Sequence, residues 1–191
     1  MNTGKTYSPL ATDLSRYNNS SYRPGPNWKI VAWFLVNPIF LNSYLPIPVS
    51  VKRLILRVFG AKIGEGVMIK PRINIKYPWL LSVGNHVWIG EQVWIDNLVN
   101  VVIGDNACLS QGAMLLTGNH DYSSSTFDLK TAPITIEEGV WIGAKAVVCP
   151  GVKCHSHAVL TVGSVAVKDL EAYNIYQGNP AQWVRERNII K

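Results

Sequence analysis

The sequence is poor in charge, in cysteine and in long apolar runs. Charged residues make up 16% of its 191 residues, and so low a fraction excludes disorder driven by charge. The three cysteines form no Cys-x-x-Cys pair, which argues against a disulfide framework and favours a reducing, cytoplasmic compartment. The most apolar run, residues 30–41, contains a proline and is too short to span a bilayer. Residues 1–21 lack the apolar stretch of a secretory signal.

Acidic residues are scarce in the first third of the chain. Residues 1–62 contain eight Lys or Arg and one acid, Asp13, whereas residues 63–168 contain seven basic and eight acidic groups. The net charge of +6 therefore arises in the N-terminal segment. A protein that grips nucleic acid over its whole surface would carry basic groups throughout, so we expect no nucleic-acid partner.

Branched aliphatic residues, in one case replaced by a cysteine, recur every six positions along most of the chain. They are Ile63, Ile69, Ile75, Val83, Ile89, Ile95, Ile103, Leu109 and Leu115 and, after a break, Ile136, Ile142, Val148, Cys154 and Leu160. A helix would need apolar spacings of three and four, and a half-buried strand would need strict alternation. The period instead predicts an all-β solenoid, in which three hexads form one coil and stacked coils pair as parallel strands. Three hexads plus two residues separate Ile63 from Val83, which predicts a two-residue insertion at one corner.

The pattern divides the chain into three segments. Residues 1–62 form a basic, apolar arm with helical parts, residues 63–168 form the solenoid, and residues 169–191 form a short C-terminal tail. The repeat is lost over residues 118–135, which are rich in Ser, Thr and Asp and read as an excursion loop. Rigid solenoids place functional residues on such excursions.

The arm has two interpretations. One predicted helical face carries Val51, Leu54, Ile55 and Val58, and the other carries Lys52, Arg53 and Arg57. A helix of this kind caps the open end of a solenoid, which would otherwise expose unpaired strands. A basic amphipathic element also suits an anionic membrane face, so residues 28–59 are a candidate for peripheral contact with the inner membrane.

Four short sequence motifs, together with the repeat, point to a known protein family. They are Ile103-Gly104-Asp105-Asn106, Thr117-Gly118-Asn119-His120-Asp121-Tyr122, Trp141-Ile142-Gly143 and Gly178-Asn179-Pro180-Ala181. With the hexads, they resemble the hexapeptide-repeat sugar O-acetyltransferases, and in particular the colanic-acid-biosynthesis type, which also carries an apolar, basic N-terminal segment. The resemblance implies a left-handed parallel β-helix, an exception to the right-handed crossover rule. It also implies acetyl-CoA-dependent O-acetylation of a sugar or exopolysaccharide intermediate.

His120 is the candidate general base. It lies at the root of the excursion, and histidine suits a base that takes a hydroxyl proton because its side chain titrates near neutral pH. By its place after Thr117-Gly118, it matches the family's catalytic histidine. Asp121 and Asp96 are candidates for orienting the imidazole. Maltose-type enzymes carry an assisting asparagine, but the corresponding position here, counted back from His120, is Gly90.

The resemblance also implies where acetyl-CoA binds, along the seam between neighbouring subunits of a homotrimer. The residues that match are Ser110, Trp141, Gly143, Ala144, Val162, Val167, Lys168 and Arg185. No metal is expected, since Ser125 takes the place of the second histidine of the zinc-binding relatives of γ-carbonic-anhydrase type. Cys154 occupies an inward hexad position and Cys149 has no evident base, so we expect direct transfer rather than an acetyl-cysteine intermediate.

Two alternatives to this function stay open on the sequence. One is a non-catalytic solenoid that organises glycan assembly, and the other is an N-acetyltransferase acting on an amino sugar. The sequence does not identify the acceptor, and a lipid-linked carbohydrate is one candidate.

Overall fold

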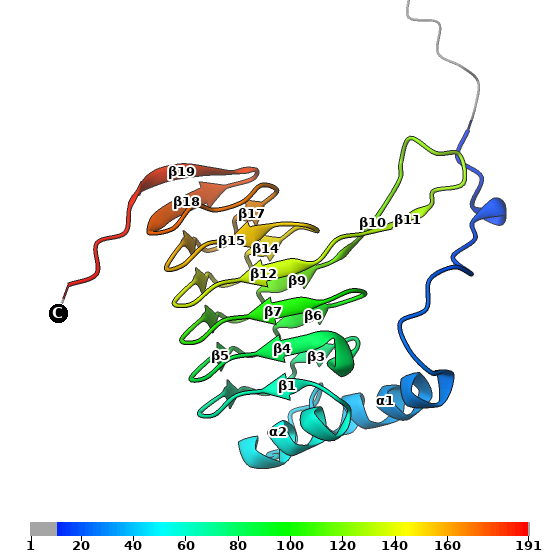
Figure 1. Cartoon of the computed structure of the whole chain (residues 1–191), viewed down its shortest axis with the longest axis horizontal. Helices are drawn as coiled ribbons and strands as arrows, with labels where there is room; N and C mark the ends of the chain where they lie inside the picture. The colour runs from blue at the N-terminus through cyan, green and yellow to red at the C-terminus, as the bar shows by residue number, and fades with distance from the viewer. Residues whose placement is uncertain (1–10, 191) are drawn as a thin grey trace, which may run out of the picture.

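The structure is a computed structural model that describes residues 11–190, so the first ten residues of the predicted arm lie outside it. It is a parallel β-solenoid with two helices at one end and a hairpin at the other (Figure 1). Three sheets form its faces A, B and C, and their strands are parallel except for the last strand of face B. Face A contains β1 (Lys62–Ile63), β4 (Leu81–Val83), β7 (Val101–Ile103), β12 (Ile134–Ile136) and β15 (Lys153–Cys154). Face B contains β2 (Met68–Ile69), β5 (Trp88–Ile89), β8 (Cys108–Leu109), β13 (Trp141–Ile142), β16 (Val159–Leu160), β18 (Asn174–Gly178) and β19 (Ala181–Glu186). Face C contains β3 (Asn74–Ile75), β6 (Trp94–Asp96), β9 (Met114–Leu116), β14 (Val147–Val148) and β17 (Val165–Ala166).

The register confirms the predicted coil length. Lys62 pairs with Ser82, and Ser82 pairs with Val102, so each of these coils has twenty residues. The insertion lies where the chain turns from face C to face A, because the long connections follow β3 and β6. After the excursion, Thr135 pairs with Lys153, a coil of three hexads without the insertion.

The inward hexad residues form one continuous core along the solenoid axis. Ile89, Leu109 and Ile142 are fully buried and stack in register on face B. The glycine that often follows the inward residue is required by the close approach of coils. A Cβ on Gly104 would lie 2.7 Å from the backbone nitrogen of Glu138 in the next coil, where no side chain fits.

The two N-terminal helices close the first coil. They are α1 (Asn27–Phe40) and α2 (Val49–Val58). A short 3₁₀ turn, η1 (Leu14–Arg16), precedes the helices, and a second one, η2 (Pro78–Leu80), follows β3. The Nε1–H of Trp33 donates to the carbonyl of Ile75 at 2.7 Å, and Nη2 of Arg57 donates to the carbonyl of Ile63 at 2.7 Å. In the next coil, the equivalent carbonyls accept backbone N–H groups from the coil before. The predicted capping role is therefore confirmed, since helix side chains replace the missing coil.

The orientation predicted for α2 is wrong. Lys52, placed on the solvent side, is 2% exposed and donates from Nζ to the carbonyl of Lys70 at 3.2 Å. Leu54 and Val58, placed on the packing face, are 60% and 72% exposed. The unpaired carbonyls of the first coil favour a cationic donor over an apolar side chain, and the aliphatic stem of the lysine fills the interface. Within residues 11–190, no helix combines the length and apolarity needed to cross a bilayer.

The C-terminal tail and the excursion are more ordered than predicted. β18 pairs in parallel with β16 and antiparallel with β19, so a hairpin covers the last coil on face B, whose edge would otherwise stay open. In the excursion, β10 (Gly118–His120) pairs antiparallel with β11 (Leu129–Thr131). The excursion is therefore a β-hairpin and not an irregular loop.

Candidate active site

Seven of the eleven predicted site residues line cavities at two corners of the solenoid. The first set lines a polar pocket of about 420 Å³ where face C turns to face A. This polar pocket is lined by Tyr17, Asn19, Tyr22, Pro24, Lys76, Tyr77, Asp96, Leu98, Gly118, Asn119, His120 and Leu129. Its walls are the long corner connections, the root of the excursion and the N-terminal segment before α1.

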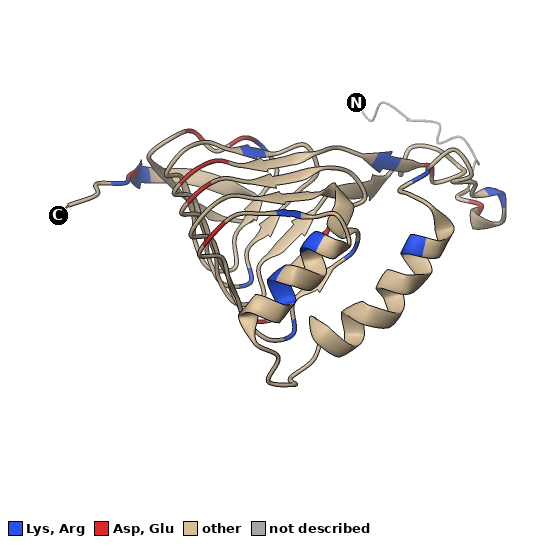
Figure 2. Ribbon diagram, turned by 60° about the horizontal axis from the view of Figure 1, so that its bottom comes forward, with Lys and Arg blue, Asp and Glu red and all other residues tan. Residues whose placement is uncertain are grey.

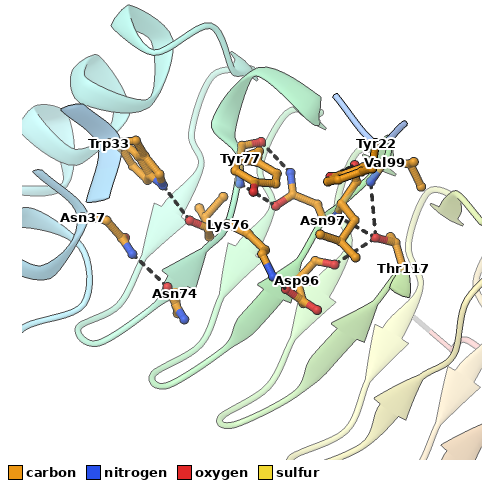
Figure 3. A network of polar contacts seen from close by, with 12 residues as sticks. Tyr22, Trp33, Asn37, Asn74, Lys76, Tyr77, Asp96, Asn97, Val99 and Thr117 are labelled. Carbon is orange, nitrogen blue, oxygen red and sulfur yellow. Dashed lines mark hydrogen bonds and ion pairs between the residues drawn. The ribbon is translucent and has the colours of Figure 1, made fainter. Parts of the chain in front are cut away.

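Buried amide and hydroxyl groups hold these connections in place (Figure 3). Asn97 is fully buried, and its amide accepts from the Tyr77 backbone N–H at 3.0 Å and donates to the Tyr77 carbonyl at 2.6 Å. The hydroxyl of Thr117, also fully buried, accepts from the backbone N–H of Leu98 at 2.8 Å and donates to the carbonyl of Asp96 at 2.9 Å. The coil before the excursion is therefore rigidly joined to the strand that carries His120.

His120 is held by its own hairpin. Its Nδ1 lies 2.9 Å from the carbonyl oxygen of Phe127, and its ring stacks on the Phe127 ring at 4.3 Å with an interplanar angle of 8°. On another side, the ring of Tyr17 lies 5.7 Å away in a tilted contact. A carbonyl oxygen can only accept, so Nδ1 carries the hydrogen and Nε2 is the nitrogen with a free lone pair.

The two candidate orienting carboxylates lie in different surroundings. Asp96 lines the polar pocket with His120, and its Oδ1 forms an ion pair with Nζ of Lys76 at 3.1 Å (Figure 3). Asp121 forms an ion pair with Nζ of Lys130 at 2.8 Å, and the resulting hydrogen bond, together with one from the Ser123 backbone, lowers the pKa of the Asp121 carboxyl. The hydrogen-bond partner of the His120 imidazole is thus a backbone carbonyl, and Asp96 is the carboxylate that shares its pocket.

The second set of predicted residues lines an apolar groove where face B turns to face C. This apolar groove has a volume of about 350 Å³ and contains Ser110, Gln111, Trp141, Gly143, Ala144, Val159, Leu160, Thr161 and Val162. The half-exposed indole of Trp141 donates from Nε1 to Oγ of Ser110 at 2.8 Å. A Cβ on Gly143 would lie 2.6 Å from the Val162 backbone nitrogen, so glycine is required there too.

Three predicted cofactor residues lie outside the apolar groove. Val167 and Lys168 follow β17 on face C and are exposed, and Arg185 is exposed on β19. The structure therefore brings five of the eight residues together, namely Ser110, Trp141, Gly143, Ala144 and Val162.

The polar pocket and the apolar groove share no lining residue. On one chain, face C lies between them, since the pocket is at its end toward face A and the groove is at its start from face B. A molecule bound in the polar pocket and a molecule bound in the apolar groove of the same chain would therefore lie at different corners of the solenoid.

Sequence reasoning missed several residues of the polar pocket. Lys76, Tyr77 and Tyr22 were not singled out, although all three line it. The Tyr22 hydroxyl donates to the carbonyl of Leu98 at 2.5 Å, and burial raises the pKa of both Tyr22 and Tyr77. One usable signal was the two-residue insertion, because it marks the corner where Lys76 and Tyr77 lie. Nothing in the sequence placed residues 17–24 beside it.

The cysteines do not form a reactive centre. Burial raises the pKa of the Cys154 thiol to about 12, and it also raises the pKa of Cys108 and Cys149. Protonated thiols are poor nucleophiles, which supports direct transfer. Within the part of the chain that the structure describes, no three His, Cys, Asp or Glu side chains are grouped to hold a metal ion.

Comparison with known proteins decides the family. The chain is 35% identical over 176 residues to a putative colanic acid biosynthesis acetyltransferase, WcaF, of Escherichia coli, covering 92% of this chain and 97% of that protein. The chain belongs to the hexapeptide-repeat sugar O-acetyltransferases. It is an acyltransferase. In a separate comparison with models of protein families, no model matches the chain.

Solved structures of the family confirm the fold. A hexapeptide-repeat containing acetyltransferase from Vibrio cholerae superposes with a TM-score of 0.77 at 21% identity, covering 85% of this chain and 92% of that one. A galactoside acetyltransferase in complex with coenzyme A gives a TM-score of 0.76 at 25% identity, covering 84% and 82% of the two chains. The expected left-handed parallel β-helix is confirmed by these matches.

Proposed function

We propose that this protein transfers an acetyl group from acetyl-CoA directly to a carbohydrate hydroxyl, with His120 as the general base. The observation that carries the proposal is the bond between Nδ1 of His120 and the Phe127 carbonyl, which leaves Nε2 as a proton acceptor beside the polar pocket. The galactoside acetyltransferase solved with coenzyme A and the colanic acid relative support the choice of donor and acceptor class.

The proton balance of the reaction needs one such base. The acceptor oxygen attacks the thioester carbonyl carbon while its proton moves to Nε2 of His120. When the tetrahedral intermediate collapses, the carbon–sulfur bond breaks, and the same Nε2 returns the proton to the departing thiolate of coenzyme A. Stacking on Phe127 and the bond to its carbonyl hold the ring in one orientation throughout.

The polar pocket suits a sugar ring. Asp96 offers carboxylate oxygens that accept hydroxyl hydrogens, and tyrosine rings form part of the wall. Lys76 pairs with Asp96, so the two charges compensate each other. A neutral carbohydrate is therefore the acceptor that this pocket favours, and we propose that its hydroxyl is directed toward Nε2 of His120.

The apolar groove suits the pantetheine arm of the donor. Trp141 and Val162 provide apolar surface, and the missing side chain of Gly143 lets an extended chain approach the backbone. Lys168 and Arg185 are exposed cations near the same end of the solenoid and are candidates for the nucleotide phosphates. Val167, beside Lys168, would contribute an apolar contact.

We propose that the active enzyme is a homotrimer. The pocket and the groove lie at different corners of one chain, so they can form one site only if the groove of one copy meets the pocket of a neighbour. The outer surface supports this arrangement. Face B shows Met68, Trp88 and Trp141 as partly or largely exposed apolar residues in one column, whereas the equivalent positions on face A include Lys62 and Lys153.

The decisive experiment is mass-spectrometric detection of acetyl transfer from acetyl-CoA to a panel of neutral sugars, amino sugars and lipid-linked oligosaccharides. A mass increase of one acetyl group on a hydroxyl is expected, and mild alkali, which hydrolyses esters but leaves amides intact, should remove it. Exclusive acetylation of an amine would instead identify an N-acetyltransferase. Failure to bind acetyl-CoA by calorimetry would contradict the proposal and favour a non-catalytic scaffold. Acetyl-CoA is made in the cytoplasm, which is where we place the reaction.

A further inference from the structure

The outer surface of α1 is apolar although nothing in the described chain covers it. One side of the helix packs on the first coil through the fully buried Trp33 and the nearly buried Asn37. The opposite side carries Trp28, Val31, Leu35 and Ile39, spaced three, four and four apart, and Trp28 and Leu35 are 71% and 68% exposed. A helix that is apolar on all sides normally lies within a core or against a second apolar phase.

Exposed apolar residues also lie on α2 and in the segment that joins the helices. Leu54 and Val58 lie one turn apart on the side of α2 that faces away from the solenoid, and Tyr44 and Leu45 in the connection are also exposed. The two helices lie side by side across the end of the solenoid (Figure 2). We call this set the end surface. It consists of Trp28, Val31, Leu35, Ile39, Tyr44, Leu45, Leu54 and Val58.

The sequence that carries the end surface has charge of one sign. Residues 14–64 contain seven Lys or Arg and no Asp or Glu. Some of these cations are used within the fold, since Lys52 and Arg57 bind carbonyls of the first coil and Lys29 lies over the ring of Trp79. Arg53 lies beside Leu54 on α2, and within residues 11–190 it makes no side-chain hydrogen bond or ion pair.

We propose that the end surface docks on an anionic membrane, with both helices lying flat in the headgroup region. Apolar side chains with flanking cations and no acids match the chemistry of a bilayer face that carries acidic lipids. Trp28 belongs to one of the two residue types that concentrate at the boundary of headgroups and acyl chains. With fourteen residues, α1 is about 21 Å long, which suits a helix in the interface plane rather than one across the bilayer.

The charge also argues against a face-to-face contact between two end surfaces. If two end surfaces met face to face, the cations of α1 and α2 would oppose their counterparts, and neither helix carries an acid to compensate them. Such an interface repels itself, whereas an anionic bilayer neutralises it. The orientation differs from the one the sequence predicts for α2, because the membrane-facing residues are Leu54 and Val58 and not a basic stripe that includes Lys52.

Vesicle flotation tests the proposal without requiring acetyl transfer, so its failure is independent of the proposed activity. The full chain is mixed with vesicles of phosphatidylcholine alone or with vesicles in which about a third of the lipid is the anionic phosphatidylglycerol. We expect the protein to float with the anionic vesicles and to float less at high salt. Combining Leu35→Glu with Leu54→Glu should reduce the partition coefficient at least about tenfold, since each change puts a charge into the interface. Arg53→Gln should reduce binding to anionic vesicles about fivefold.

The matched control is Ile189→Glu, because Ile189 is similarly exposed but lies at the opposite end of the chain. This variant should float like the wild type. A second measurement uses a substitution that preserves the fold. Brominated lipids quench the fluorescence of tryptophans that contact the membrane. If each of the seven tryptophans is changed to Phe in turn, Trp28→Phe should reduce this quenching most. Equal flotation of the wild type and the double variant, or no flotation of either, would overturn the proposal. It would also be overturned if light scattering showed that the double variant lowers the particle mass, since a neighbouring copy would then cover the end surface.

Discussion

The imidazole Nδ1 of His120 lies 2.9 Å from the carbonyl oxygen of Phe127, seven residues further along the same excursion. The hairpin that carries the base therefore also fixes its tautomer. A carbonyl in this role differs from a carboxylate, because it adds no charge to the pocket and keeps its hydrogen-bonding character at every pH. The first prediction concerns this residue.

Replacing His120 with Ala should lower kcat about 10²- to 10⁴-fold, as expected when a general base is lost. Acetyl-CoA affinity should change little, because His120 is not among the residues that line the apolar groove. The matched control is His86→Asn, since His86 is exposed at a different corner and asparagine tolerates its φ of 55°. Steady-state kinetics and calorimetry measure both quantities. Near-normal turnover of the Ala variant would exclude His120 as the base.

Asp96 and Asp121 should behave differently when each is changed to Asn. Asp96→Asn removes a carboxylate from the polar pocket and leaves Lys76 unpaired, so kcat/KM for the acceptor should fall about 10- to 150-fold. Asp121→Asn breaks an ion pair with the exposed Lys130, and its effect should stay below about fivefold. If the two variants lose activity equally, the pocket does not distinguish the carboxylates as proposed.

Trp141→Ala should weaken acetyl-CoA binding about 10- to 100-fold, because the indole forms a wall of the apolar groove. Ser110→Ala removes the hydroxyl that accepts from the indole and should weaken binding by less than about tenfold. Calorimetry measures the affinities, and light scattering checks that each variant keeps its particle mass. Trp183→Ala, at an exposed position on β19, serves as the control. An unchanged affinity for Trp141→Ala would remove the groove from the donor site.

Trp33→Phe should destabilise the fold by about 1–3 kcal/mol, since the buried carbonyl of Ile75 would lose its donor. The thermal midpoint should fall by roughly 2–12 °C. Trp28→Phe is the control, because Trp28 is largely exposed on the same helix and should leave the midpoint unchanged. Equal midpoints for both variants would show that α1 does not replace a missing coil.

Stability should depend on Glu137 in acid. Hydrogen bonds from Lys153 and Ser156 lower the pKa of the Glu137 carboxyl to about 2. The folded pKa lies below that of the unfolded chain, so the stabilisation is complete above about pH 4.5 and is lost as the pH falls toward 2. Urea unfolding of the wild type and Glu137→Gln should therefore differ at pH 7 and converge at pH 2. A difference that is constant across this range would contradict the assigned pKa.

Much of the fold could be predicted because the solenoid is a local pattern repeated in sequence. The hexads place Ile69, Ile89 and Leu109 in one column, and each coil contacts its neighbours in the same way. The ends of the solenoid could not be predicted in the same manner. At the first coil, the open carbonyls of Ile63 and Lys70 decide the orientation of α2, and an amphipathic pattern contains no information about those acceptors.

The residues of the candidate site also differ in whether the sequence could predict them. His120 and the residues of the apolar groove were found from strings that are contiguous in sequence. Lys76, Tyr77 and Tyr22 were missed because they meet His120 only through the stacking of coils and the return of residues 17–24 to the same corner. The carbonyl partner of His120 was also missed, since a backbone oxygen has no sequence signature and its position depends on how the hairpin folds.

The sequence by itself determined the architecture, the coil length, the family and the histidine. Only the tertiary structure decided which group orients that histidine, which carboxylate shares its pocket, and which side of the N-terminal helices faces outward. The physical reason is the range of the interactions involved. Hexad periodicity is set by neighbours along the chain and between adjacent coils, whereas caps, corners and pockets satisfy hydrogen-bonding groups whose partners lie many residues away.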